Sequence, residues 1–248
     1  MSLRKSKSDW ENLAQIDAKW AVLTRHNKKY DRWNEDEFFA TGEKEIDDFL
    51  TQLNRDNIEV SYGKSLDFGC GLGRLSRALA HHFAEVWGID ISREMISQAQ
   101  QIHKQNKHLT FIYNPNPDLS CLRNDQFDLV YSFITLQHVP ERNLVKNYLI
   151  EFVRVLKPGG LLYFQLPSVR DYSPIRSVLL KLRGGIFRLL VNLGLSPGYC
   201  FAHLRVAPYM HMTFIPSDQI RELLEPIAII LRVENEQQTN TAYYVRKL

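Results

Sequence analysis

The residues best suited to chemistry stand where an apolar segment breaks into glycines, in Leu66-Asp67-Phe68-Gly69-Cys70-Gly71-Leu72-Gly73-Arg74-Leu75-Ser76. Glycine lacks a Cβ, so backbone with glycines at alternate positions can turn sharply and approach a ligand closely. A helical pattern follows, and the free N–H groups of a helix N-terminus point back at such a turn. A second apolar segment then ends in Asp90, an acid that suits a ribose hydroxyl pair. This order of strand, glycine turn, helix, strand and acid indicates a nucleotide-type ligand.

Length and composition limit the classes of protein to consider. The 248 residues are enough for one α/β domain with an attached cap, and the net charge of +3 is no footprint of nucleic-acid binding. The three cysteines, Cys70, Cys121 and Cys200, show neither the paired spacing of a metal site nor a disulfide framework. The basic N-terminus lacks the apolar core of a signal peptide, and no apolar run is long enough to span a bilayer. We therefore expect a cytoplasmic protein without a metal.

From residue 64 the chain alternates between strand and helix patterns, which predicts a parallel sheet covered on both faces. The expected strands are 65–68, 85–90, 109–113, 127–133 and 160–166, and the expected helices are 73–83, 93–106 and 142–156. Ser92 is the expected N-cap of the second of these helices, and Lys157-Pro158-Gly159-Gly160 predicts a helix stop and a tight turn. A helix at 217–224, capped by Ser217 or Asp218, precedes a closing antiparallel hairpin of strands 227–234 and 241–246.

Two parts of the chain fall outside this alternation. Residues 1–62 are expected to form a helical cover, with helices over 10–26 and 34–53 and with Gly42 weakening the second. Residues 63–248 form the expected ligand-binding domain, and its pattern lapses over an insert at 167–215. Within the insert, 175–195 is apolar and basic, and Gly184-Gly185 predicts a break in its middle. A lid, a membrane-surface helix and a partner interface are the three interpretations, and the expected break favours a lid over an acceptor pocket.

Four motifs together resemble class I S-adenosylmethionine-dependent methyltransferases. In chain order they are the glycine turn 66–73, Gly88-Ile89-Asp90-Ile91-Ser92 followed by Met95, Phe127-Asp128-Leu129-Val130-Tyr131-Ser132 with Leu136-Gln137-His138-Val139, and Val153-Arg154-Val155-Leu156-Lys157-Pro158-Gly159-Gly160. The match covers about residues 64–166. The resemblance implies a doubly wound, mostly parallel seven-stranded sheet with the last strand antiparallel. It also favours a methyltransferase over a nicotinamide-dinucleotide site, the other reading of the glycine turn.

The resemblance further implies S-adenosylmethionine as cofactor and a set of residues that bind it. Its methionine end would lie against Gly69, Gly71 and Gly73, its amino group near Asp67, and its ribose hydroxyls on Asp90. The family's acid after the third strand is absent here, and an asparagine oxygen, of Asn114 or Asn116, can accept the same hydrogen bond from adenine. The remaining expected cofactor contacts are Cys70, Ile91, Met95, Ser132, Phe133 and Gln137.

Two histidines are candidate general bases, because imidazole titrates near neutral pH. His138 follows the fourth strand. In a functional role it would line the pocket beside the sulfonium methyl, and in a structural role it would make a local hydrogen bond before Pro140. His211 follows the insert and either faces the acceptor or is an ordinary loop histidine. Methyl transfer from a sulfonium needs mainly orientation and desolvation, so an enzyme without any general base is the third possibility.

The class of methyl acceptor is inferred mainly from motifs that the sequence lacks. Ser132-Phe133-Ile134-Thr135 stands where methyltransferases acting on adenine or glutamine amino groups keep an Asn/Asp-Pro-Pro-aromatic element, and no basic stripe with interleaved aromatics suggests a long nucleic acid. We therefore expect a small-molecule acceptor, with O-methylation slightly preferred. A non-catalytic S-adenosylmethionine-binding or regulatory protein, or a methyltransferase acting on RNA or protein, are the alternatives. The sequence leaves the oligomeric state open.

Overall fold

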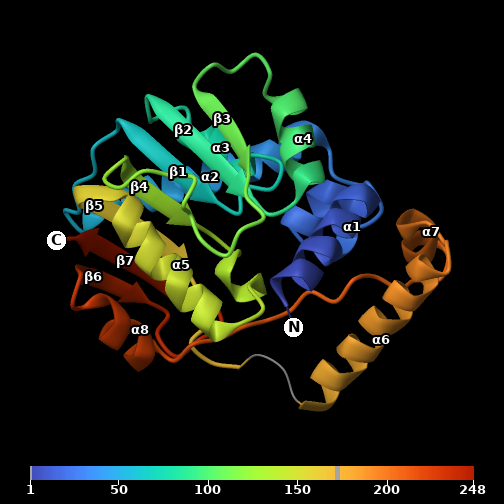
Figure 1. Ribbon diagram of the computed structural model, residues 1–248. Coiled ribbons are helices and arrows are strands. Elements are labelled where there is room, and N and C mark those ends of the chain that lie inside the picture. The colour runs from blue at the N-terminus through green and yellow to red at the C-terminus, as the bar shows by residue number, and fades with distance from the viewer. Residues whose placement is uncertain (1, 171–173) are drawn as a thin grey trace.

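A seven-stranded sheet forms the centre of the protein in the computed structural model, which describes residues 2–170 and 174–248 (Figure 1). The strand order is β3-β2-β1-β4-β5-β7-β6, and β7 lies antiparallel between β5 and β6. This confirms the predicted sheet with its antiparallel last strand. The strands are β1 (Lys64–Phe68), β2 (Glu85–Asp90), β3 (Leu109–Tyr113), β4 (Phe127–Ser132), β5 (Leu156–Gln165), β6 (Ala228–Glu234) and β7 (Ala242–Lys247).

Helices cover both faces of the sheet. On one face α2 (Glu35–Arg55), α3 (Arg74–Leu79) and α4 (Arg93–Ile102) bury side chains such as Phe49, Leu79 and Ala99 against the strands. On the other, α5 (Arg142–Val155) and α8 (Ser217–Leu224) enclose the larger core around Phe152 and Leu224. Both α3 and α4 end about one turn earlier than predicted. The two cores hold the strand ends, and the loops that follow them, in fixed positions.

The helix α2 starts after Asn34, whose side-chain oxygen accepts a hydrogen bond from the Glu37 N–H at 3.2 Å. It then continues through Gly42, so the expectation that this glycine weakens the helix was wrong. A Cβ at position 42 would lie 2.4 Å from the carbonyl oxygen of Arg74. Glycine is therefore present because α2 and the start of α3 approach so closely.

The first helix, α1 (Leu3–Val22), begins earlier and ends earlier than predicted, and it contains a kink at Asp17. The Asp17 carboxylate accepts the backbone N–H groups of Trp20, at 3.1 Å, and of Asp31, at 3.0 Å. The first of these bonds gives a partner to a backbone N–H of the helix just after the kink. The second ties α1 to the loop that follows it, which includes the short helix η1 (His26–Lys28).

The predicted break at Gly184-Gly185 was wrong, because α6 (Pro174–Asn192) runs through it without interruption. A Cβ on Gly184 would lie 2.5 Å from the Cβ of Tyr209, so this glycine permits close contact with a neighbouring segment. The short α7 (Pro197–Ala202) follows, capped by the Ser196 hydroxyl. Residues 171–173 of the expected lid lie outside the described residues.

Three local predictions met different outcomes. Ser92 caps α4 as expected, since its hydroxyl accepts the Met95 N–H at 3.1 Å. Neither Ser217 nor Asp218 caps α8: Pro216 precedes it, and the Ser217 hydroxyl instead accepts a hydrogen bond from Tyr243. The turn expected at 157–160 stops α5, but it lies within β5, where a register shift against β4 accommodates it.

Among the residues described, no helix is both long and apolar enough to cross a membrane.

Candidate active site

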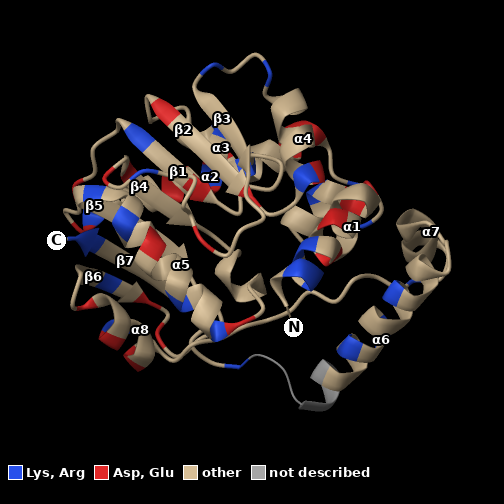
Figure 2. Ribbon diagram, viewed as in Figure 1, with Lys and Arg blue, Asp and Glu red and all other residues tan. Residues whose placement is uncertain are grey.

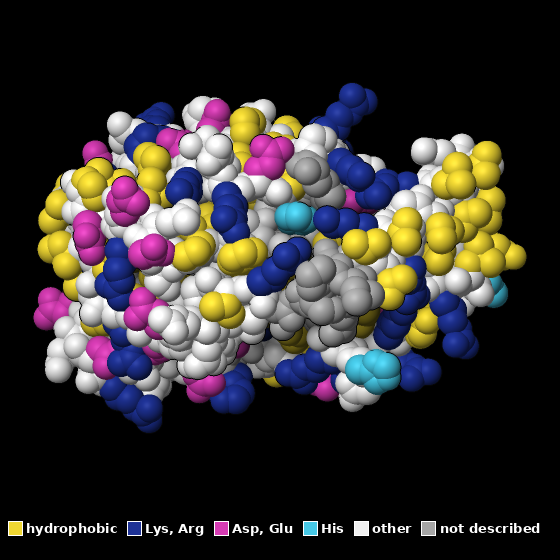
Figure 3. Space-filling view, turned by 90° about the horizontal axis from the view of Figure 1, so that it is seen from below, with side chains coloured by type: hydrophobic (Ala, Val, Ile, Leu, Met, Phe, Trp, Pro, Cys, Tyr) yellow, Lys and Arg dark blue, Asp and Glu magenta, His cyan; other side chains and the backbone are white. Residues whose placement is uncertain are grey.

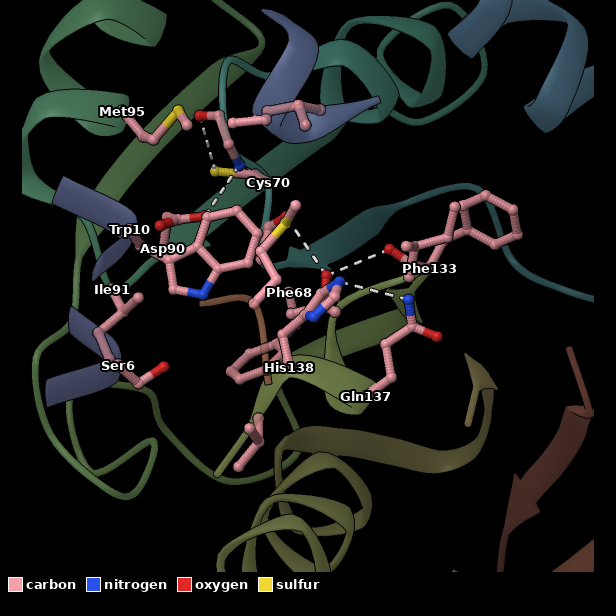
Figure 4. A pocket seen from close by; sticks show the side chains of 18 of the residues that line it. Ser6, Trp10, Phe68, Cys70, Asp90, Ile91, Met95, Phe133, Gln137 and His138 are labelled. Atoms are coloured by element: carbon pink, nitrogen blue, oxygen red, sulfur yellow. Dashed lines mark hydrogen bonds between the residues drawn. The ribbon is translucent and has the colours of Figure 1, made fainter. Parts of the chain in front are cut away.

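A pocket of about 370 Å³ opens at the carboxyl ends of the central strands. Its walls come from the glycine turn after β1, the end of β2, the loop after β4, and α1. Figure 4 shows side chains from these separate segments converging on one space, with Asp90 and His138 on different sides of the Trp10 indole. Loops at the carboxyl ends of parallel strands are where α/β folds bind ligands.

Asp90 ends β2 and lies in the pocket wall. Its two carboxylate oxygens accept backbone N–H groups, from Gly71 at 2.9 Å and from Ser92 at 2.8 Å. These bonds fix the carboxylate while leaving each oxygen a further lone pair. Burial raises the pKa of Asp90, and the backbone N–H groups oppose that rise. The arrangement offers acceptors for a pair of ligand hydroxyls.

The glycine turn wraps closely under two neighbouring segments. Gly69 has φ +79°, and a Cβ there would lie 2.1 Å from the Thr135 side chain of the loop after β4. Gly71 has φ +52°, and a Cβ there would lie 2.5 Å from Val22 of α1. At both positions glycine is required for two reasons, because the backbone is left-handed and because a Cβ would have no space. The turn thereby brings its backbone to the pocket surface.

The backbone is strained at Ile134, in the loop after β4. Its φ of +56° is unfavourable for a β-branched residue, and Ile134 itself lines the pocket. Strained backbone of this kind clusters at ligand-binding sites.

Arg74 opens α3 and contributes a buried positive charge to the pocket wall. One terminal nitrogen donates to the Thr41 hydroxyl at 3.3 Å, whereas Nε has no hydrogen-bond partner among the described residues. Burial lowers the pKa of its guanidinium. A buried donor without a partner is costly, and a carboxylate is the group that would satisfy it. The sequence analysis did not identify this residue, although it directly follows the last glycine of the turn.

His138 lies in the short helix η2 (Leu136–His138), on the pocket wall beside Trp10, with ring centroids 5.3 Å apart. Its Nδ1 is 2.8 Å from the backbone carbonyl oxygen of His211. Because a carbonyl only accepts, Nδ1 carries the proton and Nε2 keeps a lone pair, which the Gln137 amide contacts at 3.3 Å. Burial lowers the pKa of His138 to about 4. The imidazole is therefore a neutral acceptor at physiological pH.

Comparison with known proteins agrees with this geometry. The model of a methyltransferase domain family matches residues 66–164. A ubiquinone biosynthesis O-methyltransferase of Coxiella burnetii is 38% identical over 102 residues, which are 40% of this chain and 41% of that protein. Squalene methyltransferase 1 of Botryococcus braunii is 32% identical over 128 residues, 50% of this chain and 33% of its own length. The chain thus spans less than half the length of these curated relatives.

The solved structure of magnesium protoporphyrin IX methyltransferase from Synechocystis with bound S-adenosylmethionine shares the fold. It is 17% identical, with a TM-score of 0.58, and the match covers 98% of this chain and 97% of that one. The chain contains a class I S-adenosylmethionine-dependent methyltransferase domain. The four motifs recognised in the sequence all lie within the matched residues 66–164.

The pocket of this methyltransferase domain fits S-adenosylmethionine chemically. Asp90 has lone pairs for the ribose hydroxyls, and the unpartnered Nε of Arg74 fits the carboxylate of the methionine part. Most of the lining side chains are apolar, which suits a purine ring and a desolvated methyl group. Among the described residues no group of three or more His, Cys, Asp or Glu side chains is placed to hold a metal ion.

Ten of the residues predicted from the sequence line this pocket. They are Gly69, Cys70, Gly71, Asp90, Ile91, Met95, Asn114, Phe133, Gln137 and His138. Burial raises the pKa of the Cys70 thiol, so it stays neutral. The Asn114 amide is already engaged, because its nitrogen donates to the Asp118 carbonyl at 2.7 Å and its oxygen accepts the Asn116 N–H at 3.2 Å. One oxygen lone pair and one N–H of the amide remain for adenine.

Four predicted cofactor contacts, Asp67, Gly73, Asn116 and Ser132, lie outside the pocket wall. Asp67 is almost fully buried and accepts a hydrogen bond from the Ser76 hydroxyl at 2.6 Å, while burial raises its pKa to about 6. Gly73 faces the Phe111 ring, and the Ser132 hydroxyl donates to the Phe68 carbonyl. Asp67, Gly73 and Ser132 thus make contacts away from the pocket wall.

His211, the second candidate base, presents its side chain to a separate cavity of about 260 Å³. That cavity shares Pro140 and Met212 with the first, and it also contains Arg142 and Lys181. The hydrogen bond between His211 and His138 comes from the backbone of His211 and not from its side chain. The structure therefore separates the two histidines that the sequence grouped as possible bases.

The contribution of α1 to the pocket was missed in the sequence, although a covering helix was expected. Leu3, Ser6 and Trp10 line one side, and the end of the helix, from Ala21 to the loop at Thr24, lines another. Glu11 holds the helix in place by accepting hydrogen bonds from the Ser92 hydroxyl and from the Glu94 N–H. The helix is thus fastened to the loop that follows Asp90.

Proposed function

We propose that this chain transfers the methyl group of S-adenosylmethionine to a hydroxyl group of a small-molecule acceptor. The observation that carries this proposal is the tautomer of His138, whose unprotonated Nε2 lies at the pocket wall and accepts from the Gln137 amide nitrogen at 3.3 Å, a contact that an acceptor hydroxyl would replace. A hydroxyl nucleophile must lose its proton as it is methylated, whereas an acceptor that is already anionic needs only orientation. A fixed, neutral nitrogen acceptor beside the pocket therefore supports O-methylation.

The chain's own residues supply binding, orientation and exclusion of water. When bound, S-adenosylmethionine supplies an electrophilic methyl group on a sulfonium. Asp90 would hold the ribose of the cofactor and Arg74 its carboxylate, and His138 would accept the hydroxyl proton at Nε2. Trp10 and the rest of α1 would keep water from the site, because they form one of its walls.

The acceptor that we propose is largely apolar. Side chains at the His138 side of the pocket include Val139, Pro140, Met210 and Met212, and Met210 and Met212 belong to the insert at 167–215. The relatives named above act, by their names, in ubiquinone biosynthesis and on squalene. The insert would then serve as part of the acceptor lid, and residues 1–62 as the helical cover over the cofactor.

Incubation with S-adenosylmethionine and a panel of hydroxylated and aminated small molecules tests the proposal. Mass spectrometry should detect a gain of one methyl group on a hydroxyl of at least one apolar acceptor, together with S-adenosylhomocysteine. His138→Ala should lose this product, while His211→Ala should retain it. Methylation confined to RNA or protein, or cofactor binding without turnover on any acceptor, would overturn it.

A further inference from the structure

The outer face of α6 carries a continuous apolar stripe of side chains that are each between 50% and 69% exposed. The apolar stripe consists of Val178, Leu179, Leu182, Ile186 and Leu189 of α6 and of Leu193, which directly follows the helix. At 3.6 residues per turn these positions fall within an arc of about 100°. Figure 3 shows the hydrophobic surface gathered on the right, over α6 and α7. An exposed apolar patch of this kind marks an interaction surface.

The opposite face of α6 is firmly held, so the apolar stripe is presented in a fixed direction. Phe187 is fully buried, Gly184 contacts Tyr209, and Arg188 pairs with the buried Asp9 of α1 at 3.2 Å. The helix also runs without the break that the glycine pair suggested. The objection to one long interfacial helix is therefore removed.

The charge around the apolar stripe has one sign. No Asp or Glu occurs in the sequence between Asp171 and Asp218, whereas this stretch contains Lys181, Arg183 and Arg205 as well as Arg188. Figure 2 shows Lys and Arg but no Asp or Glu on α6. By their helical positions Lys181 and Arg183 flank the two sides of the apolar stripe. An apolar stripe with basic flanks is typical of helices that lie in a membrane interface.

We propose that α6 binds the surface of an anionic membrane, with the apolar stripe among the acyl chains and Lys181 and Arg183 at the headgroups. A second copy of this chain fits less well. Two-fold contact through the stripe would bring basic flanks together with no acid between them. A bilayer with anionic lipid supplies both the apolar medium and the opposite charge. This binding requires no particular acceptor, so it stands apart from the proposed reaction.

Co-sedimentation of the full chain with lipid vesicles tests the proposal. We expect pelleting with vesicles of equal parts phosphatidylcholine and phosphatidylglycerol, and much less with phosphatidylcholine alone. Leu189→Asp should lower the partition coefficient at least about tenfold, because it places a charge in the apolar stripe. Lys181→Ser should lower it about fivefold. Ile229→Asp, at a half-exposed apolar position on β6, is the matched control and should bind like the wild type.

Leu189→Asp should keep the wild-type unfolding temperature, because Leu189 is exposed, and should keep methyl transfer to a water-dissolved acceptor, because Leu189 lines neither cavity. Equal binding to both vesicle types, or unchanged binding of Leu189→Asp, would overturn the proposal. So would a wild-type dimer in solution that Leu189→Asp converts to monomer, since this would assign the apolar stripe to a second copy.

Discussion

The Nδ1–H of His138 donates to the backbone carbonyl oxygen of His211, 2.8 Å away, across 73 positions of sequence. The last part of the insert thus orients the imidazole that faces the pocket. Thr213 strengthens this link, because its N–H donates to the Gln137 carbonyl at 2.6 Å and its hydroxyl donates to the Val139 carbonyl. Contact between these two chain segments therefore fixes both the tautomer of His138 and the direction of its Nε2.

Replacement of His138 by alanine should lower kcat about a hundredfold or more, since general-base catalysis contributes on that scale. The affinity for S-adenosylmethionine should change no more than about twofold, because Asp90 and Arg74 remain. Steady-state kinetics and calorimetry measure the two effects. His211→Ala is the matched control: it retains the carbonyl that His138 needs, and its side chain lies in the other cavity. Equal loss of kcat in both variants would contradict the role assigned to His138.

The pH dependence of kcat should be flat from neutral pH down to about 5. Burial lowers the pKa of His138 to about 4, so Nε2 loses its lone pair to a proton only below that range. A pH–rate profile at saturating substrate, in buffers of constant ionic strength, measures this. An inflection near 6.5 would show a histidine with an ordinary pKa at the site instead.

Gly71→Ala should destabilise the fold by about 1–2 kcal/mol, because it forces a Cβ into a left-handed backbone and toward Val22. Urea unfolding at equilibrium measures the loss. The double variant with Val22→Ala should recover part of it by removing the steric contact. Full stability in Gly71→Ala would mean that α1 does not pack against the turn as described.

Glu11→Ala should loosen α1 from the pocket, because it removes the acceptor of the Ser92 hydroxyl and the Glu94 N–H. We expect dissociation of S-adenosylmethionine to become about tenfold faster, in line with the loss of hydrogen bonds to a charged group. Stopped-flow fluorescence, which can follow Trp10, measures the rate. Glu59→Ala, at an exposed position away from the pocket, serves as control, and equal rates in both variants would count against the fastening of α1.

Much of the fold was predictable because local pattern and tertiary packing agree there. The strands β2 and β3 have the predicted bounds, since short segments rich in β-branched and aromatic residues favour strands. The predictions made from glycines were wrong where a tertiary contact, and not the local backbone, requires the glycine. Gly42 and Gly184 read as helix breakers in sequence, yet each lies inside a helix where another segment approaches too closely for a Cβ.

Some residues of the site were predictable from the sequence and others were not. Asp90 and the glycine turn stand in a local motif, so their place in the pocket follows from the sequence. The buried charge of Arg74 and the contributions of Ser6, Trp10 and Glu11 depend on how α2 and α1 dock, which no spacing encodes. Asp67 shows the opposite error: it belongs to the motif, but its side chain turns to Ser76 behind the pocket.

Calorimetric titration of S-adenosylmethionine into the wild type and Asp90→Ala tests the central claim most directly. Asp90 is the acceptor proposed for the ribose hydroxyls, so the variant should bind at least about a hundredfold more weakly. Its circular dichroism spectrum should remain that of a folded protein, and Asp48→Ala, at an exposed site on α2, should bind as the wild type does. Wild-type affinity in a folded Asp90→Ala variant would contradict the assignment of this pocket to S-adenosylmethionine.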